Sequence, residues 1–319
     1  MGPFRPLTET AMLIMGIDTD SLPDQFNECV PGRTLILDGD GIAYAVAATC
    51  KRLDTAIRHF QQEVLKRMFL AKAEYARVHL TARNSWKNGR FLVRAVKPYQ
   101  ANRRGKPKPP MLEPLREAVA DEANWLPEYS VVLNRLLEAD DAMMQEAYAL
   151  QERGVVCSED KDLCMTPWPY LDLRRGIVLP PEPVGYLKYR VTDAGAVKLS
   201  GRGPLYFWAQ MIAGDPADNI QGLLHIGGKR CGPITALEYL HGCESEGLDA
   251  AANRVIGAYR DIRQNVVAEA WLLWLLRHPE DNALAYLLEH DLEPLNREFV
   301  EGCADSDWFE EVQEEEEYA

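Results

Sequence analysis

Short strand-like runs alternate with segments of helical spacing through the first half of this 319-residue chain. Four runs are typical of buried strands: Thr34–Leu37, Arg77–Thr81, Ser130–Leu133 and Val155–Cys157. The segments between them predict helices over residues 42–50, 54–71, 111–123 and 139–152. Strands that alternate with helices favour an α/β fold with a parallel sheet flanked by helices.

The pattern changes after Pro167. Residues 170–197 predict short strands and turns, and from Leu205 onward the chain is mainly helical, with a strongly apolar helix around 271–276. We therefore predict an N-terminal extension over residues 1–32, an α/β domain over 33–200, a helical domain over 201–300 and an acidic, disordered tail over 301–319.

The cysteines and the apolar runs indicate a cytoplasmic protein. There are seven cysteines, scattered and without a CxxC pair, which fits free thiols in a reducing compartment. No apolar run approaches the roughly 20 residues that span a bilayer, and residues 1–20 carry one basic residue, Arg5. We expect neither a membrane span nor a signal peptide.

The charge of the chain is segregated. Thirty-five basic and 49 acidic residues give a net charge of −14, which excludes a basic coat over the whole molecule. Yet Arg83–Pro110 holds nine basic residues and no acidic one, together with Trp86, Phe91 and Tyr99. Basic residues interleaved with aromatics suit single-stranded nucleic acid; the alternative is a solvated, flexible loop.

The last 19 residues, 301–319, hold nine acidic residues and no basic one. Self-repulsion and the scarcity of apolar residues predict disorder there. Such a tail is a candidate segment for binding a protein partner or for mimicking nucleic acid, and the alternative is an end that only increases solubility.

Acidic residues gather where predicted strands end and helices begin. They are Asp38, Asp40, Glu138, Asp140, Asp141, Asp160, Asp162, Asp215 and Asp218. Ligands bind beyond the carboxyl ends of parallel strands, and carboxylates that converge there repel unless cations neutralise them. An all-oxygen set suits Mg²⁺ or Mn²⁺, and two such ions promote phosphodiester hydrolysis. Taken singly, each of these groups is equally explained as a helix cap or turn residue.

These motifs resemble those of the flap-endonuclease-like 5′ nucleases, and most of all the 5′→3′ exonucleases of short-tailed bacteriophages. The similar segments run in the same order through residues 33–240: Leu35–Asp40, Tyr99–Arg103, Leu137–Asp141, Ser158–Leu163, Gly214–Ile220 and Ile226–Arg230. The resemblance implies a PIN-like sheet, a basic arch or loop over 83–110, and a helix–three-turn–helix, a form of helix-hairpin-helix, over 215–240.

The resemblance also implies two metal sites, for two Mg²⁺ or Mn²⁺ ions. Asp38, Glu138, Asp140 and Asp141 would form the first, and Asp160, Asp162, Asp215 and Asp218 the second. A monovalent cation is implied at the helix–three-turn–helix. The expected DNA-binding residues are Arg94, Lys97, Tyr99, Gln100, Arg103, Arg104, Lys106, Gly227, Gly228, Lys229 and Arg230.

The glycine pair in this last group has its own physical interpretation. Gly227 and Gly228 let the backbone approach a duplex phosphate, and Lys229 and Arg230 add positive charge. A nucleotide-binding P-loop is the competing interpretation. It fails because Arg230, not Ser or Thr, follows Lys229 and because the upstream glycine spacing differs by one residue.

The chain departs from the family's pattern at two positions that bear on chemistry. Ala82 stands just after the second strand, where relatives usually carry Asp, and Gln100 stands where they carry Lys. A weaker first metal site is one consequence, unless Asp40 compensates. Lys97, Arg103 and Arg104 are candidates to replace the missing lysine.

The function expected from the resemblance is a Mg²⁺-dependent 5′→3′ exodeoxyribonuclease that hydrolyses duplex or flap DNA, and also RNA–DNA hybrids, in phage DNA replication. Its location would be the host cytoplasm. A catalytically weakened DNA-binding or scaffold protein on the same fold is the alternative. A phosphatase with Asp38 as nucleophile fits the Asp38–Gly41 motif but leaves the basic stretch unexplained.

The net charge of −14 is compatible with a nucleic-acid partner once the charges of the tail and of the expected metal ligands are subtracted. The tail contributes −9 and the eight expected metal ligands −8, so that −14 + 17 leaves +3 for the remainder. Affinity for DNA should therefore depend on divalent ions as well as on salt.

Overall fold

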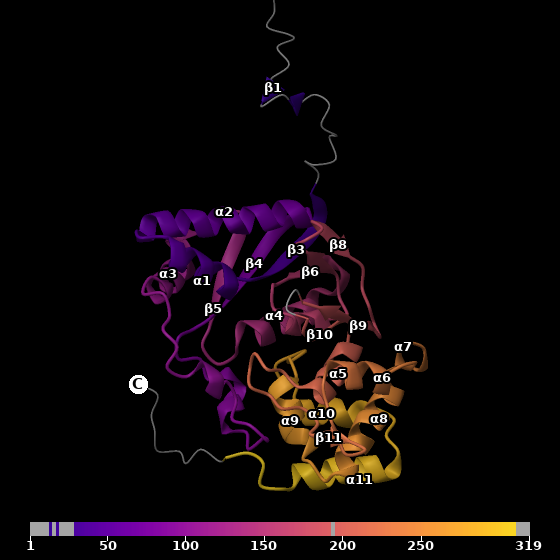
Figure 1. Ribbon diagram of the computed structural model, residues 1–319. Coiled ribbons are helices and arrows are strands. Elements are labelled where there is room, and N and C mark those ends of the chain that lie inside the picture. The colour runs from indigo at the N-terminus through magenta and orange to yellow at the C-terminus, as the bar shows by residue number, and fades with distance from the viewer. Residues whose placement is uncertain (1–12, 15–16, 19–28, 193–194, 311–319) are drawn as a thin grey trace, which may run out of the picture.

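The computed structural model describes residues 13–14, 17–18, 29–192 and 195–310. Its centre is a six-stranded sheet of order β5-β4-β3-β6-β7-β8 (Figure 1). The strands are β3 (Val30–Asp38), β4 (Ala73–Thr81), β5 (Tyr129–Asn134), β6 (Gly154–Cys157), β7 (Tyr170–Asp172) and β8 (Ile177–Leu179). All neighbouring pairs are parallel except β7 and β8, which are antiparallel. The predicted α/β class and parallel sheet are confirmed.

Alternate residues of the central strand β3 face two different cores. Leu35 and Leu37 belong to one cluster with residues of α1 (Asp40–Thr49), α2 (Leu53–Ala71) and α3 (Leu112–Ala120). Ile36 belongs to a second cluster with Met143 of α4 (Ala139–Leu150). Because successive side chains of a strand point to opposite faces, α1–α3 cover one face of the sheet and α4 the other, as Figure 1 shows.

The second core continues into a helical region that begins with α5 (Leu205–Ala213), a helix with eight of its nine residues buried. The helices that follow are α6 (Pro233–Tyr239), α7 (Cys243–Glu246), α8 (Leu248–Asp261), α9 (Val266–Leu273), α10 (Ala283–Glu289) and α11 (Pro294–Ala304). One shared core therefore joins the helical region to α4 and fixes its position against the sheet.

Three two-stranded hairpins stand apart from the main sheet: β1 (Leu13–Ile14) with β2 (Ile17–Asp18), β9 (Tyr186–Val191) with β10 (Val197–Arg202), and β11 (His225–Ile226) with β12 (Lys229–Arg230). Gly227 and Gly228 form the tight turn between β11 and β12, both with positive φ (56° and 77°). Among the described residues, no helix is long and apolar enough to cross a membrane.

Three predicted domain limits fall inside ordered elements. β3 begins at Val30, within the expected extension, and β10 runs across position 200. The expected tail begins inside α11, and Trp308 and Phe309 pack against the second core through ring contacts with Trp271 at 5.2 and 5.9 Å. Apolar burial thus holds residues up to 309, and the glutamate run 314–317 lies outside the described residues.

Residues 83–110 follow β4 as a chain of turns with two 3-10 helices, η3 (Lys87–Leu92) and η4 (Ala101–Arg103). This segment lies against the rest of the molecule. Val93 forms a β-bridge with Phe309, and the Val96 amide donates to the buried carboxylate of Glu269 at 3.1 Å. The second oxygen of Glu269 accepts the Gly222 amide at 3.1 Å, which ties the basic segment to the loop after α5.

Candidate functional site

The carboxyl ends of β3 and β6 place Asp38 beside the loop that carries Asp160. Ser158, the residue after β6, links them: its Oγ donates to Asp38 Oδ2 at 2.7 Å and accepts from the Asp160 amide at 2.8 Å. The other Asp38 oxygen accepts the Asp40 amide at 2.9 Å. Adjacent parallel strands therefore bring these acidic residues to one edge of the sheet, as their sequence positions predicted.

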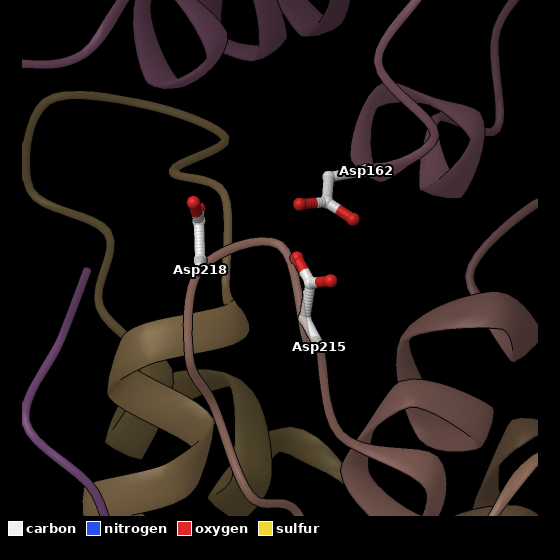
Figure 2. A group of neighbouring side chains, drawn as sticks. All are labelled: Asp162, Asp215 and Asp218. Carbon is white, nitrogen blue, oxygen red and sulfur yellow. The ribbon is translucent and has the colours of Figure 1, made fainter. Parts of the chain in front are cut away.

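A second group of carboxylates lies close by (Figure 2). Asp162, Asp215 and Asp218 each offer an oxygen within 4.8 Å of the others. Asp162 comes from η7 (Asp162–Met165), and the other two come from the loop after α5. Among the described residues, this is the one group of three acidic, His or Cys side chains so closely gathered.

The loop that carries Asp215 and Asp218 is closed by its own backbone. Asp215 and Ile220 exchange hydrogen bonds of 2.9 and 2.8 Å, and a side chain at Gly214 would place its Cβ 2.3 Å from the Gln221 carbonyl oxygen. Gly214 also has φ +70°, a conformation that favours glycine. The Gly-Asp-x-x-Asp-Asn-Ile pattern is thus the sequence of a tight loop that presents two carboxylates.

Burial and mutual repulsion shift the titration of this site. Burial, then the charge of Asp40, raises the pKa of Asp38 to about 6. Burial and the neighbouring Asp160 and Asp215 raise the pKa of Asp162 to about 7, although Lys161 opposes the shift. The pKa of Asp140 is raised well above its usual range by burial and by Asp38 and Asp160. Asp140 therefore belongs electrostatically to the same site.

The donor set fits a hard divalent cation. Every candidate ligand is a carboxylate, the donor type that Mg²⁺ and Mn²⁺ prefer. A bound cation would favour the ionised forms whose pKa values burial now raises. Lys161 partly fills this role, since its Nζ lies 2.8 Å from Asp162 Oδ1 and 2.9 Å from Asp215 Oδ1.

Two further expected metal ligands, Glu138 and Asp141, also pair with cations of the protein. Asp141 is fully buried, and both of its oxygens accept from Arg90, at 2.7 and 2.8 Å. Glu138 accepts from Arg90 at 3.0 Å and from Lys87 at 2.8 Å. Burial alone would raise the pKa of Glu138, but Arg90 and Lys87 outweigh it and lower that pKa. This geometry assigns Asp141 a structural ion pair.

The basic segment covers the acidic site directly. The Tyr99 hydroxyl donates to Glu138 Oε2 at 2.6 Å, and Gln100 Nε2 donates to Asp218 Oδ1 at 3.1 Å. Arg103 forms an ion pair with Asp218. The Tyr99–Arg103 motif therefore meets the metal-binding motifs in space although more than a hundred residues separate Arg103 from Asp218.

Lys87 places a positive charge beside Gln100, the position where the resemblance implied a lysine. Its Nζ donates to Gln100 Oε1 at 2.8 Å and to Glu138 Oε1 at 2.8 Å. An ammonium group is therefore present next to Gln100, delivered from η3 rather than from the motif itself. Of the replacements expected from sequence, Arg103 also reaches the site through its pair with Asp218, and both Arg103 and Arg104 are exposed.

Position 82, where the resemblance implied an aspartate, is an alanine directly after the end of β4. Ala82 is buried, and the nearby carboxylate is that of Asp40, which reaches the adjoining Thr81. The Asp40 carboxylate accepts the Thr81 amide at 3.1 Å and pairs with Arg116 at 2.7 Å. Asp40 is thus occupied by contacts within the fold.

Within the described part of the chain, the remaining expected DNA-binding residues form no ion pair with the carboxylates of the site. Arg94 pairs with Asp307, Lys97 is half-buried, and Lys106 is exposed. Gly227, Gly228, Lys229 and Arg230 are exposed on the β11–β12 hairpin. A Cβ built at either glycine meets nothing within 4 Å, so a large molecule has access to this turn.

Sequence reasoning missed four residues of the site: Lys87, Arg90, Ser158 and Lys161. Ser158 and Lys161 lie inside the quoted Ser158–Leu163 motif, and their spacing between acidic residues was an available signal. Lys87 and Arg90 were counted only as charges of the basic stretch. Nothing in their local sequence distinguishes them from cations that face solvent.

No known protein-family model matches the chain, and no curated protein matches it either. Similar solved structures come from bacteriophage T5, and each is similar over 86% of this chain. A protein co-crystallised with metal ions has 13% identity, 98% of its own chain covered and a TM-score of 0.49. A flap endonuclease in a pseudo-enzyme–product complex with DNA and metal ions has 14%, 98% and 0.47. A 5′-exonuclease with bound zinc has 15%, 99% and 0.46.

Proposed function

We propose that this protein is a divalent-metal-dependent nuclease that hydrolyses phosphodiesters of duplex DNA in the 5′→3′ direction, as an exonuclease and at flaps. The observation that carries the proposal is the approach of Asp162, Asp215 and Asp218 within 4.8 Å at a sheet edge, beneath a basic segment. Carboxylates suit the metal, and the neighbouring cations suit a phosphate.

The roles of the residues follow from this arrangement. Asp162, Asp215 and Asp218 would hold one ion. Asp38 and Asp160, which Ser158 bridges, would hold the second together with Asp140, whose pKa they raise. When bound, the ions lower the pKa of a water molecule and neutralise charge that develops on the phosphate. Lys87 and Arg103 add positive charge beside the carboxylates, where it stabilises an anionic transition state.

Further parts of the proposal concern substrate and surroundings. We propose RNA–DNA hybrids as a second substrate class. We also propose that the protein acts in phage DNA replication, within the host cytoplasm. We propose that the Gly227–Arg230 turn contacts duplex phosphates as part of a helix–three-turn–helix that holds a monovalent cation. The sheet is proposed to be PIN-like, and the glutamate-rich end is proposed to bind a protein partner.

A catalytically weakened DNA-binding or scaffold protein is the second candidate. The ion pairs of Glu138 with Lys87 and Arg90, and of Asp218 with Arg103, favour it. These cations neutralise carboxylates without metal. Under this alternative the protein would bind DNA and would not cleave it in the presence of Mg²⁺ or Mn²⁺.

Cleavage of a 5′-labelled flap duplex separates the two candidates. The unmodified protein is expected to release short 5′ products with Mg²⁺ and none with chelator. An Asp160→Ala/Asp162→Ala variant should lose this activity, whereas Glu152→Gln/Glu244→Gln, two exposed positions elsewhere, should keep it. Binding without metal-dependent cleavage by the unmodified protein would favour the scaffold.

A further inference from the structure

The β9–β10 ribbon concentrates positive charge on one face. Its cross-strand partners include Arg190↔Lys198 and Lys188↔Ser200. Directly opposed residues share a face and neighbours two apart repeat it, so Lys188, Arg190 and Lys198 all lie on the same side. All three are exposed, and within the described residues none of them forms an ion pair. Neither strand contains an acidic residue.

The other face of the ribbon packs against the protein at its base, through Leu187, Leu199 and Gly201, whereas Tyr189 and Val191 on the same face are exposed. Leu187 and Leu199 contact the second core, and Gly201 lies so close to Tyr206 of α5 that a Cβ would come within 2.9 Å of its ring. The elements α5 and α6 both contact the ribbon on this side. The cationic face therefore points away from the helical region and toward solvent.

The base of the ribbon is hydrogen-bonded to segments beside the carboxylate site. Arg202 donates to the carbonyl oxygens of Pro180 and Trp168 at 3.0 and 2.9 Å. The Gly203 amide donates to the Cys164 carbonyl at 2.9 Å, within η7, the element that begins with Asp162. The direction of the ribbon is thus fixed relative to that aspartate.

Two like charges stand directly opposite each other on the cationic face. Like charges directly opposite each other in a two-stranded ribbon are destabilising, and Arg190 faces Lys198 without a compensating carboxylate in either strand. Exposed Lys and Arg side chains gathered on one face are the groups that contact the phosphate oxygens of a nucleic-acid backbone.

We propose that the cationic face of β9–β10 binds the phosphate backbone of a nucleic-acid duplex arm that extends from the carboxylate site. This inference rests on the proposed function, because it assigns the surface to the same substrate. It adds a contact region separate from the basic segment and from the β11–β12 hairpin.

Binding without cleavage tests the surface separately from the chemistry. Fluorescence anisotropy with a labelled duplex, in chelator, is measured over a salt series for the full chain and for Lys188→Gln/Arg190→Gln/Lys198→Gln. The salt slope is expected to fall by up to about 2.7, because each phosphate that the protein no longer neutralises lowers it by about 0.9. The matched control Lys51→Gln/Arg174→Gln/Arg175→Gln removes equal charge from exposed positions elsewhere and should bind as the unmodified protein does.

A single variant separates binding from folding. Lys198→Glu places an opposite charge across from Arg190, so it should preserve or raise Tm while weakening duplex binding. An unchanged affinity and slope in the triple variant would overturn the inference, as would an equal loss in the control. A chain that binds through this face but never cleaves with metal would overturn the proposed function and leave the surface standing.

Discussion

Arg90 holds the carboxylates of Asp141 and Glu138 in place beneath the site. Its guanidinium is buried and donates to Asp141, Glu138 and the Trp274 carbonyl. Arg90→Met would leave the Asp141 charge buried and unpaired, and removal of one partner of a buried pair costs about 3–5 kcal/mol. Urea denaturation should show this loss, with a smaller loss in Arg90→Met/Asp141→Leu. A single variant within about 1 kcal/mol of the unmodified protein would refute the structural role of the pair.

Lys87 is predicted to provide the positive charge that the motif lacks at Gln100. Its ammonium contacts both Gln100 and Glu138. Removal of one preorganised electrostatic group typically lowers kcat by about 10²–10³. Single-turnover cleavage by Lys87→Gln should show such a loss, whereas Lys108→Gln, an exposed position of the same segment, should show little. Equal losses in the two variants would show that Lys87 acts only through the overall charge of the basic segment and not through its position beside Gln100.

At the residue scale the sequence pointed to carboxylates at the strand ends, of which Asp162, Asp215 and Asp218 gather closely, but it did not predict which cations contact them. Asp38 and Asp160 converge because strand ends in a parallel sheet share an edge. Arg90 and Lys87 reach Glu138 and Asp141 only because residues 83–110 fold back over α4. That path depends on long-range packing against Phe309 and Glu269, which leaves no periodic signal in the local sequence.

At the scale of elements, the carboxylates at the end of β3 and in η7 predict that the free energy of unfolding depends on pH. Folding raises the pKa of Asp38 to about 6 and of Asp162 to about 7. The folded state therefore binds more protons than the unfolded state between about pH 4 and 7, so the free energy of unfolding falls as pH rises through this range. The loss is on the order of 3 kcal/mol for Asp38 alone.

Thermal unfolding in chelator at pH 5 and pH 8 measures this effect. Tm is expected to be lower at pH 8, and Mg²⁺ or Mn²⁺ should restore it there because a bound cation stabilises the ionised carboxylates. Asp38→Asn/Asp162→Asn should flatten the profile. A metal-free protein that is more stable at pH 8 than at pH 5 would contradict the raised pKa values of these carboxylates.

Elements with a regular apolar pattern were predictable, and those built on turns were not. The four predicted strands are β3, β4, β5 and β6, four of the six strands of the sheet. Residues 83–110 have no such pattern, because short 3-10 turns and positive φ at Lys87, Asn88 and Gln100 arise from tertiary contacts. The end of the chain through Phe309 was assigned to a tail by its charge, although aromatic burial decides its structure.

For the molecule as a whole, the segregated charges of the sequence come together in space. Asp307, at the start of the acidic end, pairs with Arg94 of the basic segment, and Phe309 bridges to Val93. The basic segment in turn covers the carboxylate site through Arg103 and Asp218. Net charge therefore says little about partners here, because opposite charges neutralise one another locally.

Equilibrium binding of Mn²⁺ at neutral pH tests the central claim most directly. The unmodified chain is expected to bind Mn²⁺, and Asp162→Asn/Asp215→Asn should lose the ion held with Asp218, because two of the three gathered carboxylates are removed. Glu152→Gln/Glu244→Gln, which removes equal charge from exposed positions, should bind as the unmodified chain does. An unmodified chain that binds no Mn²⁺, or an Asp162→Asn/Asp215→Asn variant that binds it unchanged, would contradict the account.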